Sequence, residues 1–219
     1  MSSINCADIQ VRLRSVADLS SSRLPRHGRH GSRVTIFPSK KNGAPLMCES
    51  LLEAAFCLEL ERRADVASYK IHPYTLNFKN SKYRYTPDFE VTYTSGAQQL
   101  IEVKNDESFE CIRTKSRLLR ITDLLAENDC LLECLPMRCF YNAARAINLD
   151  YLYHRSYSSN GLADRAIQDH LSKQGQATPI YKLLENAFNS IEIAHALFYR
   201  AVECNLRKPI TVKTLAWLK

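Results

Sequence analysis

Residues 83–104, YRYTPDFEVTYTSGAQQLIEVK, contain two strand-like runs separated by a short polar stretch. Apolar and polar residues alternate along 87–93 and again toward 104, and Thr94-Ser95-Gly96 between the runs has the composition of a tight turn. We therefore predict a β-hairpin whose turn is centred on Ser95. This register restricts the fold strongly, because a slip of one residue would move every side chain to the other face.

The predicted hairpin brings two acidic side chains together. Successive side chains of a strand point to opposite faces, so Glu102 and Lys104 share one face of the second strand. With the turn at Ser95, Asp88 lies opposite Glu102, and their Cβ atoms would be about 5 Å apart. Two carboxylates at this distance repel each other, whereas a divalent cation between them reverses the sign of the interaction. Oxygen ligands of this kind suit Mg²⁺ or Mn²⁺.

Lys104 adds a third chemical group to this face. Its ammonium can orient an attacking water and neutralise charge that develops on a phosphate. Aspartate, glutamate and lysine around a metal therefore predict phosphodiester hydrolysis. The alternative is a half-exposed hairpin whose charged side chains face solvent.

The patterns around the hairpin predict an α/β domain over residues 1–155. Residues 1–45 are polar, and we expect them to be rich in loops. The predicted elements after them are helices at 48–63, 109–128 and 141–147, and strands at 66–78 (interrupted by Pro73), in the hairpin and at 129–136. The core order is αβββαβ.

Residues 156–219 have a different character and predict a small second domain. Three short helical patterns cover 161–175, 179–188 and 189–210, and the last opens with Asn189 and Glu192 at capping-box spacing. This favours a small helical domain, either winged-helix or helix-turn-helix. A plain helical bundle for protein contacts is the alternative, and residues 211–219 could close the chain as a strand or a short helix.

The charge balance favours a polyanionic partner. The 219 residues carry a formal net charge of +7, and arginines and histidines gather in RLPRHGRHGSR at 23–33. Such a surface attracts nucleic acid through Coulomb forces and counterion release. The candidate contacts are Arg26, Arg29, Arg33, Arg113, Lys115 and Arg117. The alternatives are a solvated basic surface, a basic arm without a specific role and a solvated helix face.

Other features argue against a membrane protein and a zinc protein. The apolar runs are far shorter than a membrane span, and the N-terminus lacks an apolar signal core. We therefore expect a soluble, intracellular protein without a membrane partner. None of the eight cysteines forms a CxxC pair, and Cys130, Cys134 and Cys139 have no neighbouring histidine. We expect reduced thiols rather than a zinc site.

The motif Pro87-Asp88 … Glu102-Val103-Lys104 is that of the PD-(D/E)xK superfamily, the restriction-endonuclease-like nucleases. The stretches SLLEAAFCLELE, HPYTLNF, YRYTPDFEV and LIEVK resemble the TnsA family more specifically. These proteins are the endonuclease subunits of heteromeric cut-and-paste transposases. The resemblance covers residues 50–155 and is weaker toward the C-terminus, where that family also has a short helical domain.

The resemblance implies roles for particular residues. Asp88 and Glu102 would be metal ligands, joined by the main-chain carbonyl of Val103, and Lys104 would be the catalytic lysine. Glu53 would be the acid on the preceding helix, bound to the metal directly or through water.

Two further positions are less settled. Glu49 competes with Glu53 for the role of helical acid, and the motif register favours Glu53. His72 stands where we expect a glutamine in related nucleases. This departure puts a polar role in doubt, and His72 could instead be packed or face DNA.

The resemblance also implies a function. The chain would be a Mg²⁺- or Mn²⁺-dependent DNA endonuclease that cleaves the 5′ strands of double-stranded DNA at transposon ends. A DDE-type transposase would cut and join the 3′ strands, and an AAA+ ATPase regulator would be a further partner. The expected location is the bacterial cytoplasm, at the nucleoid. The alternatives are a restriction enzyme or junction resolvase of the same fold, and a DNA-bridging module with an inactive nuclease site.

Overall fold

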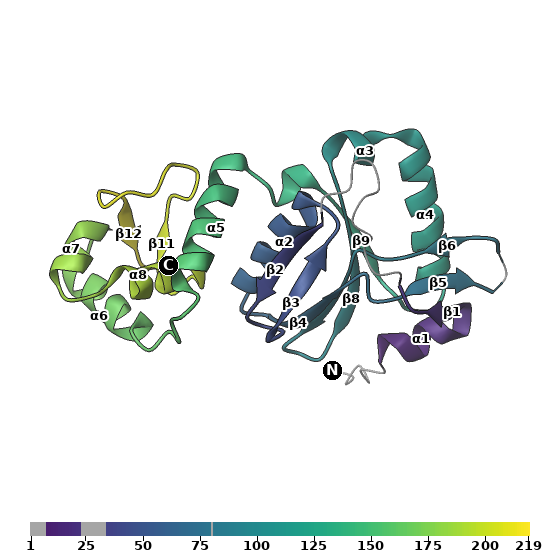
Figure 1. Ribbon diagram of the computed structural model, residues 1–219, viewed down its shortest axis with the longest axis horizontal. Helices are drawn as coiled ribbons and strands as arrows, with labels where there is room; N and C mark the ends of the chain where they lie inside the picture. The colour runs from purple at the N-terminus through teal and green to yellow at the C-terminus, as the bar shows by residue number, and fades with distance from the viewer. Residues whose placement is uncertain (1–7, 23–33, 80) are drawn as a thin grey trace. The chain divides into compact units, whose positions relative to one another are not determined.

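The computed structural model describes residues 8–22, 34–79 and 81–219. In these ranges the chain is mixed α/β, with eight α-helices and four small β-sheets. It divides into two compact units (Figure 1). The first comprises Met1–Glu61 and Asp65–Phe140, and the second comprises Arg62–Ala64 and Tyr141–Lys219.

The first unit is built on a four-stranded sheet. Its strands, in spatial order, are β4 (Val66–Ile71), β7 (Phe89–Tyr93), β8 (Gln98–Lys104) and β9 (Leu132–Pro136). The pairs β4–β7 and β7–β8 are antiparallel, and β8–β9 is parallel. The predicted hairpin is confirmed: Phe89 pairs with Ile101 and Thr92 with Gln98, which is the register of a turn centred on Ser95.

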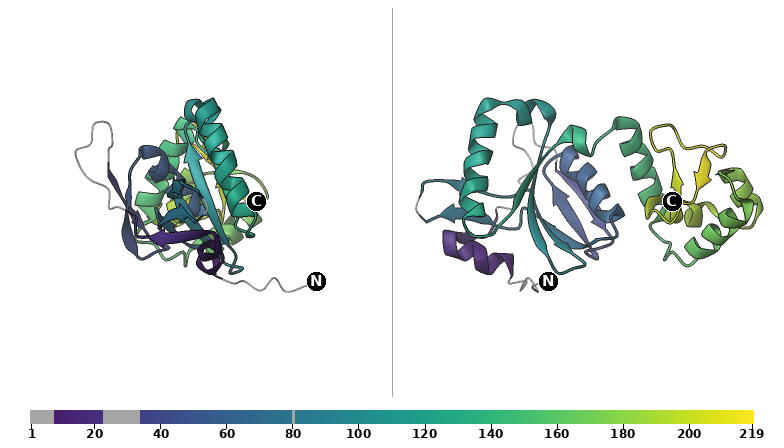
Figure 2. Two further views of the ribbon diagram at one scale, coloured as in Figure 1. Left: turned by 90° about the vertical axis from the view of Figure 1, so that its right-hand side faces the viewer. Right: turned by 180° about the vertical axis from the view of Figure 1, so that it is seen from behind.

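Helices cover both faces of this sheet. Figures 1 and 2 show α2 (Leu51–Arg62) and α4 (Ile112–Ala126) on opposite sides of it, and the short α3 (Asp106–Glu110) precedes α4. On the α2 side, the rings of Phe56 and Phe89 meet edge-on with centroids 5.0 Å apart. On the α4 side, Leu100 packs with residues of the helix such as Ile121. The predicted order of helix, three strands, helix and strand holds for the elements of this sheet and its two covering helices, and two further strands lie between β4 and β7 in the chain.

The N-terminal segment differs from the expectation of loops. It contains α1 (Ile9–Val16), β1 (Ala17–Ser20), β2 (Thr35–Ser39) and β3 (Ala44–Cys48). Ile9, Leu13 and Ala17 are fully buried and join the core that holds Leu100. The prediction was wrong because polar and charged residues dominate this segment, and the burial of its few apolar side chains depends on partners that are distant in the sequence.

The predicted strand at 66–78 is two strands in different sheets. After β4 the chain breaks at His72 and Pro73, and β5 (Thr75–Phe78) pairs with β1 on one side and β6 (Arg84–Tyr85) on the other. Proline cannot donate to a strand ladder, which explains the break. As a result, the end of β4, the His72-Pro73 break and β6 all lie near the start of β7.

The second unit combines four helices with a small sheet. The helices are α5 (Ala143–Ser156), α6 (Asp164–Gln174), α7 (Ile180–Glu185) and α8 (Ser190–Phe198). The antiparallel strands, in spatial order, are β10 (Thr178–Pro179), β12 (Leu215–Trp217) and β11 (Glu203–Cys204). This sheet argues against a plain helical bundle. The capping box of Asn189 and Glu192 is confirmed.

The units divide after Phe140, whereas the sequence placed the boundary at 155/156. That position is the end of α5, which is also twice as long as the helix predicted at 141–147. Leu152 and Tyr153 of α5 are buried, and the ring of Tyr153 lies 5.0 Å from that of Phe198 in α8. The helix therefore belongs to the core of the second unit.

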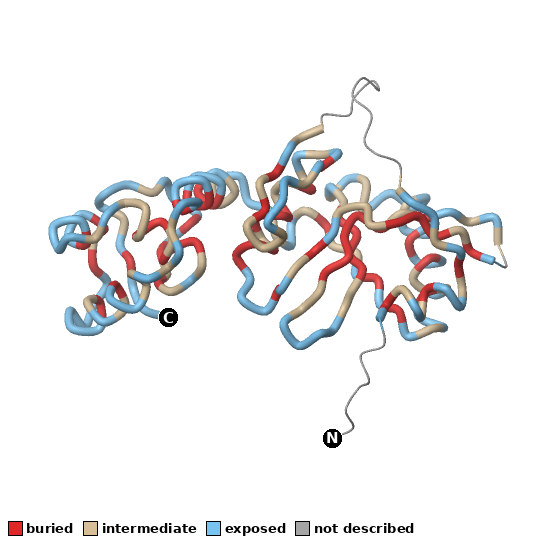
Figure 3. The backbone as a smooth tube through the Cα atoms, turned by 60° about the horizontal axis from the view of Figure 1, so that its bottom comes forward, coloured by how far each residue is buried: buried red, intermediate tan, exposed pale blue. Residues whose placement is uncertain are grey.

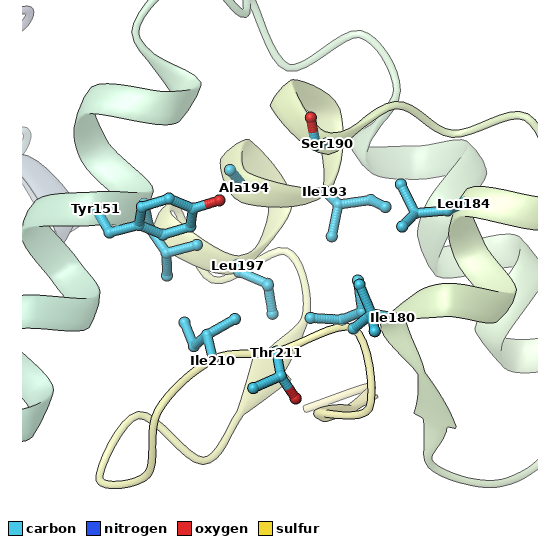
Figure 4. A pocket seen from close by; sticks show the side chains of 11 residues that line it. Tyr151, Ile180, Leu184, Ser190, Ile193, Ala194, Leu197, Ile210 and Thr211 are labelled. Carbon is cyan, nitrogen blue, oxygen red and sulfur yellow. The ribbon is translucent and has the colours of Figure 1, made fainter.

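Buried residues fill the interior of each unit (Figure 3). The second unit also contains a cavity of about 260 Å³, into which aliphatic side chains such as Ile180, Ile193 and Leu197 project (Figure 4). None of the helices in the described ranges is long and apolar enough to cross a membrane.

Candidate active site

A pocket of about 450 Å³ lies in the first unit beside the end of β8. Three residues that the sequence singled out, Asp88, Glu102 and Lys104, line this pocket. Asp88 directly precedes β7, and the other two residues end β8, so the hairpin alone brings the three together. The expectation that they share one face holds in the structure.

Lys104 lies between the two acids. Its Nζ is 2.5 Å from Oε1 of Glu102 and 3.3 Å from Oδ2 of Asp88, and it also donates to the main-chain carbonyl of Val103 at 3.2 Å. The backbone N–H of Val103 donates to Oδ2 of Asp88 at 2.9 Å. The ammonium therefore offsets the repulsion between the carboxylates.

The single ammonium of Lys104 does not neutralise the two buried carboxylates of Asp88 and Glu102. Burial raises the pKa of Asp88, although Lys104 and the Val103 N–H oppose this effect. Burial, followed by the charge of Asp88, raises the pKa of Glu102. For Lys104 burial lowers the pKa, but the two acids together outweigh it and raise the pKa above its ordinary value. The three pKa shifts are consistent with one another, because the Lys104 ammonium has two carboxylate partners, whereas the two carboxylates share a single cation.

Tyr85 supports Glu102 from β6. Its buried hydroxyl donates to Oε2 of Glu102 at 2.7 Å, so both oxygens of that carboxylate have partners. Burial and the neighbouring Glu102 raise the pKa of Tyr85, which keeps its hydroxyl protonated as a donor. Tyr85 was not among the residues predicted from the sequence, and its position three residues before Asp88 was the only signal for it.

Glu53 is held at the first turn of α2. Its carboxylate accepts hydrogen bonds from the backbone N–H of Glu49 at 2.8 Å and from Oγ of Ser50 at 2.9 Å. Glu53 is buried, whereas Glu49 is exposed and lines the pocket. The side chain of His72 lies between Glu53 and Asp88.

His72 joins the two acids. Its Nε2 lies 3.7 Å from Oε2 of Glu53 and 3.9 Å from Oδ1 of Asp88, and ligand atoms of all three residues lie within 4.8 Å of one another. The backbone N–H of His72 also donates to the main-chain carbonyl of Asp88 at 2.9 Å. His72, for which the sequence left a polar role in doubt, thus lies beside the acids of the site.

The basic residues divide into different environments. Arg117 lines the pocket, and so does Arg84, which the sequence analysis did not name. Lys115 pairs with Glu110 at 2.5 Å, and Arg113 is exposed. The candidate contacts Arg26, Arg29 and Arg33 lie outside the described residues.

No protein-family model matches the chain, and a search of curated proteins finds no match. A functional assignment therefore depends on the geometry of this pocket and on the motif that the sequence carries.

Proposed function

We propose that this protein is a divalent-metal-dependent DNA endonuclease of the TnsA kind. The observation that carries the proposal is the meeting of Asp88, Glu102 and Lys104 in one pocket, with Glu53 behind them. Acids and a lysine so arranged suit hydrolysis of a phosphodiester. The mixed α/β fold with a hairpin at its centre is compatible with a restriction-endonuclease-like domain.

The residues present fit a hard divalent ion. Asp88 and Glu102 are buried, share one ammonium and have raised pKa values, so added positive charge would relieve their repulsion. Asp88, Glu102, the carbonyl of Val103 and Glu53 would hold Mg²⁺ or Mn²⁺. The ion would supply Lewis-acid stabilisation of charge on the phosphate.

The chain's own groups would position the substrate and the water. Lys104 would orient the attacking water and balance charge on the scissile phosphate. Arg84 and Arg117, which line the same pocket, would bind neighbouring phosphates of the DNA backbone. Tyr85 would fix the orientation of Glu102.

The finer assignment draws on the resemblance over residues 50–155 and on the net charge of +7. The substrate would be the 5′ strands at transposon ends, with a DDE-type transposase acting on the 3′ strands. An AAA+ ATPase would regulate the complex. The second unit, with its helices and three-stranded sheet, would serve as a winged-helix-like module for DNA or for these partners.

The first test is a calorimetric titration with Mn²⁺, followed by nicking of supercoiled plasmid DNA in the presence and absence of the cognate transposase. The variants are Asp88→Ala and, as a control that removes an exposed carboxylate from the same unit, Glu107→Ala. We expect the first change to abolish metal binding and cleavage and the second to leave both unchanged. Asp88→Ala protein that cleaves at the wild-type rate would contradict the assigned site.

Strand mapping then separates the nuclease classes. Cleavage of 5′ strands at transposon ends that requires the transposase supports the TnsA-like function. Cleavage that needs no transposase would favour a restriction enzyme or resolvase. Absence of metal binding both with and without duplex DNA would favour a bridging module.

A further inference from the structure

We propose that His72 is itself a metal ligand, and that its imidazole shifts the preference of the site from Mg²⁺ toward transition-metal ions such as Mn²⁺ and Co²⁺. This inference rests on the proposed function and names a ligand that the motif does not contain. The nitrogen ligand would lie on the side of Asp88 that faces Glu53, opposite the side that faces Glu102.

The distances fit a shared ion. Ligand atoms about 2.1 Å from one ion lie about 3.0 Å apart in cis positions of an octahedron and about 4.2 Å apart in trans positions. Nε2 of His72 lies 3.7 Å from the nearer oxygen of Glu53 and 3.9 Å from Oδ1 of Asp88. Only small side-chain rotations would be needed to place the three ligand atoms around one centre.

The two oxygens of Asp88 have different surroundings. Oδ2 already accepts hydrogen bonds from the Val103 N–H and from Lys104, whereas Oδ1 is the oxygen that faces His72. Both oxygens of Glu102 have donors as well, and one of these is the Lys104 ammonium. The oxygens of Glu53 also accept hydrogen bonds, but only from neutral groups, the Glu49 N–H and the Ser50 hydroxyl. The side with Glu53 and His72 therefore offers the ion two carboxylates and a neutral nitrogen without displacing Lys104.

The backbone of His72 is strained in a way that directs the side chain. Its φ is +43°, which is unfavourable for a residue with a Cβ, and the residue precedes Pro73, which restricts it further. Such conformations are unfavourable and persist where the surrounding structure enforces them. Here the His72 N–H bond to the Asp88 carbonyl fixes the residue, with its imidazole largely buried beside both acids.

The chemistry of imidazole determines the consequence. Mg²⁺ prefers oxygen ligands, whereas imidazole nitrogen suits iron, nickel, copper and zinc. Mn²⁺ also favours oxygen, but as a first-row transition metal it accepts an imidazole ligand more readily than Mg²⁺ does. A glutamine at this position would offer an amide oxygen instead. His72 therefore predicts a higher ratio of Mn²⁺ affinity to Mg²⁺ affinity than an all-oxygen site would have.

The decisive readout is the nitrogen itself. Pulsed electron paramagnetic resonance of the Mn²⁺-loaded wild-type protein should show coupling to ¹⁴N, and histidine labelled with ¹⁵N should change that coupling. This measurement needs no variant, so a folding defect cannot affect it. His72→Gln should lose the coupling, whereas His154→Gln, which removes an exposed histidine beside Asp150, should keep it.

Calorimetry with each ion alone gives the preference. We expect His72→Gln to weaken Mn²⁺ binding by at least about tenfold, the smallest cost typical of disturbing groups that support a metal site, and to change Mg²⁺ binding much less. Mn²⁺ binding that depends on Asp88 but shows no nitrogen coupling would overturn this inference and leave the proposed function intact. Failure of both ions to bind, with or without DNA, would overturn both.

Discussion

Nζ of Lys104 lies 2.5 Å from Oε1 of Glu102, on the same face of the same strand. The Lys104 ammonium reduces the repulsion between the two carboxylates in the absence of a metal, because it also lies 3.3 Å from Oδ2 of Asp88. The site is nevertheless unfavourable for folding, since burial raises the pKa of both acids. Each group of the site therefore has a measurable effect on stability as well as on activity.

Asp88→Asn should stabilise the metal-free protein while abolishing metal binding. The change removes a buried charge and leaves Lys104 paired with Glu102 alone. We expect the free energy of unfolding to rise by about 1 kcal/mol, the usual size of a single-site effect. Chemical denaturation at neutral pH, without divalent ions, measures it, and a lower stability than wild type would contradict the prediction.

The same difference should depend on pH. Because the folded-state pKa of Asp88 is raised, the folded protein binds the proton more tightly than the unfolded chain does. The cost of the charge is therefore absent below the ordinary aspartate pKa and complete above the raised one. The stability advantage of Asp88→Asn over wild type should be largest near neutrality and should shrink as the pH falls. An advantage independent of pH would indicate another cause.

Lys104→Met should separate binding from catalysis. Without the ammonium, two buried acids lack their shared partner, so we expect stability to fall by about 2 kcal/mol, somewhat less than for a fully buried pair. Metal affinity should increase, since a competing positive charge has gone, whereas cleavage should fall by about 10²-fold or more. Lys82→Met, which removes an exposed lysine, is the control. Weaker metal binding by Lys104→Met would show that the lysine does not compete with the ion.

Tyr85→Phe tests the support of Glu102. The change removes the hydroxyl that donates to Oε2 and leaves that buried oxygen without a partner, which should cost about 1 kcal/mol of stability. Cleavage should fall more than stability alone explains, because Glu102 is no longer held in one orientation. Tyr83→Phe, whose hydroxyl contacts Arg120 at the surface, should behave like wild type. Equal activities of the two variants would count against a positioning role.

The second unit should fold only when it includes α5. Leu149, Leu152 and Tyr153 are buried, and the amide of Asn148 donates to the main-chain carbonyls of Leu206 and Lys208 at 2.8 Å. A fragment of residues 141–219 should therefore unfold cooperatively in a thermal melt. A fragment of 156–219 should lack that transition, and a cooperative transition in the shorter fragment would contradict the role of α5.

Local patterns predicted those parts of the site that one hairpin builds. The alternation of side chains and the turn at Ser95 fixed the register, which brings Asp88 and Glu102 to the same end of the sheet. The capping box at Asn189 was also readable, because its two groups are three residues apart. In each case the interacting groups are close in the chain, so spacing alone carries the information.

Contacts between distant segments could not be read in this way. Local patterns were enough to predict the acidic hairpin, the flanking helices and the candidate residues Asp88, Glu102 and Lys104. The folded structure was needed to show that Tyr85 donates to Glu102, that His72 lies between Glu53 and Asp88, and that α5 packs against α8. These contacts join residues that are far apart in the sequence, so they depend on where the break at Pro73, the start of α2 and the packed core lie in space. The local periodicity of a sequence carries no information about those positions.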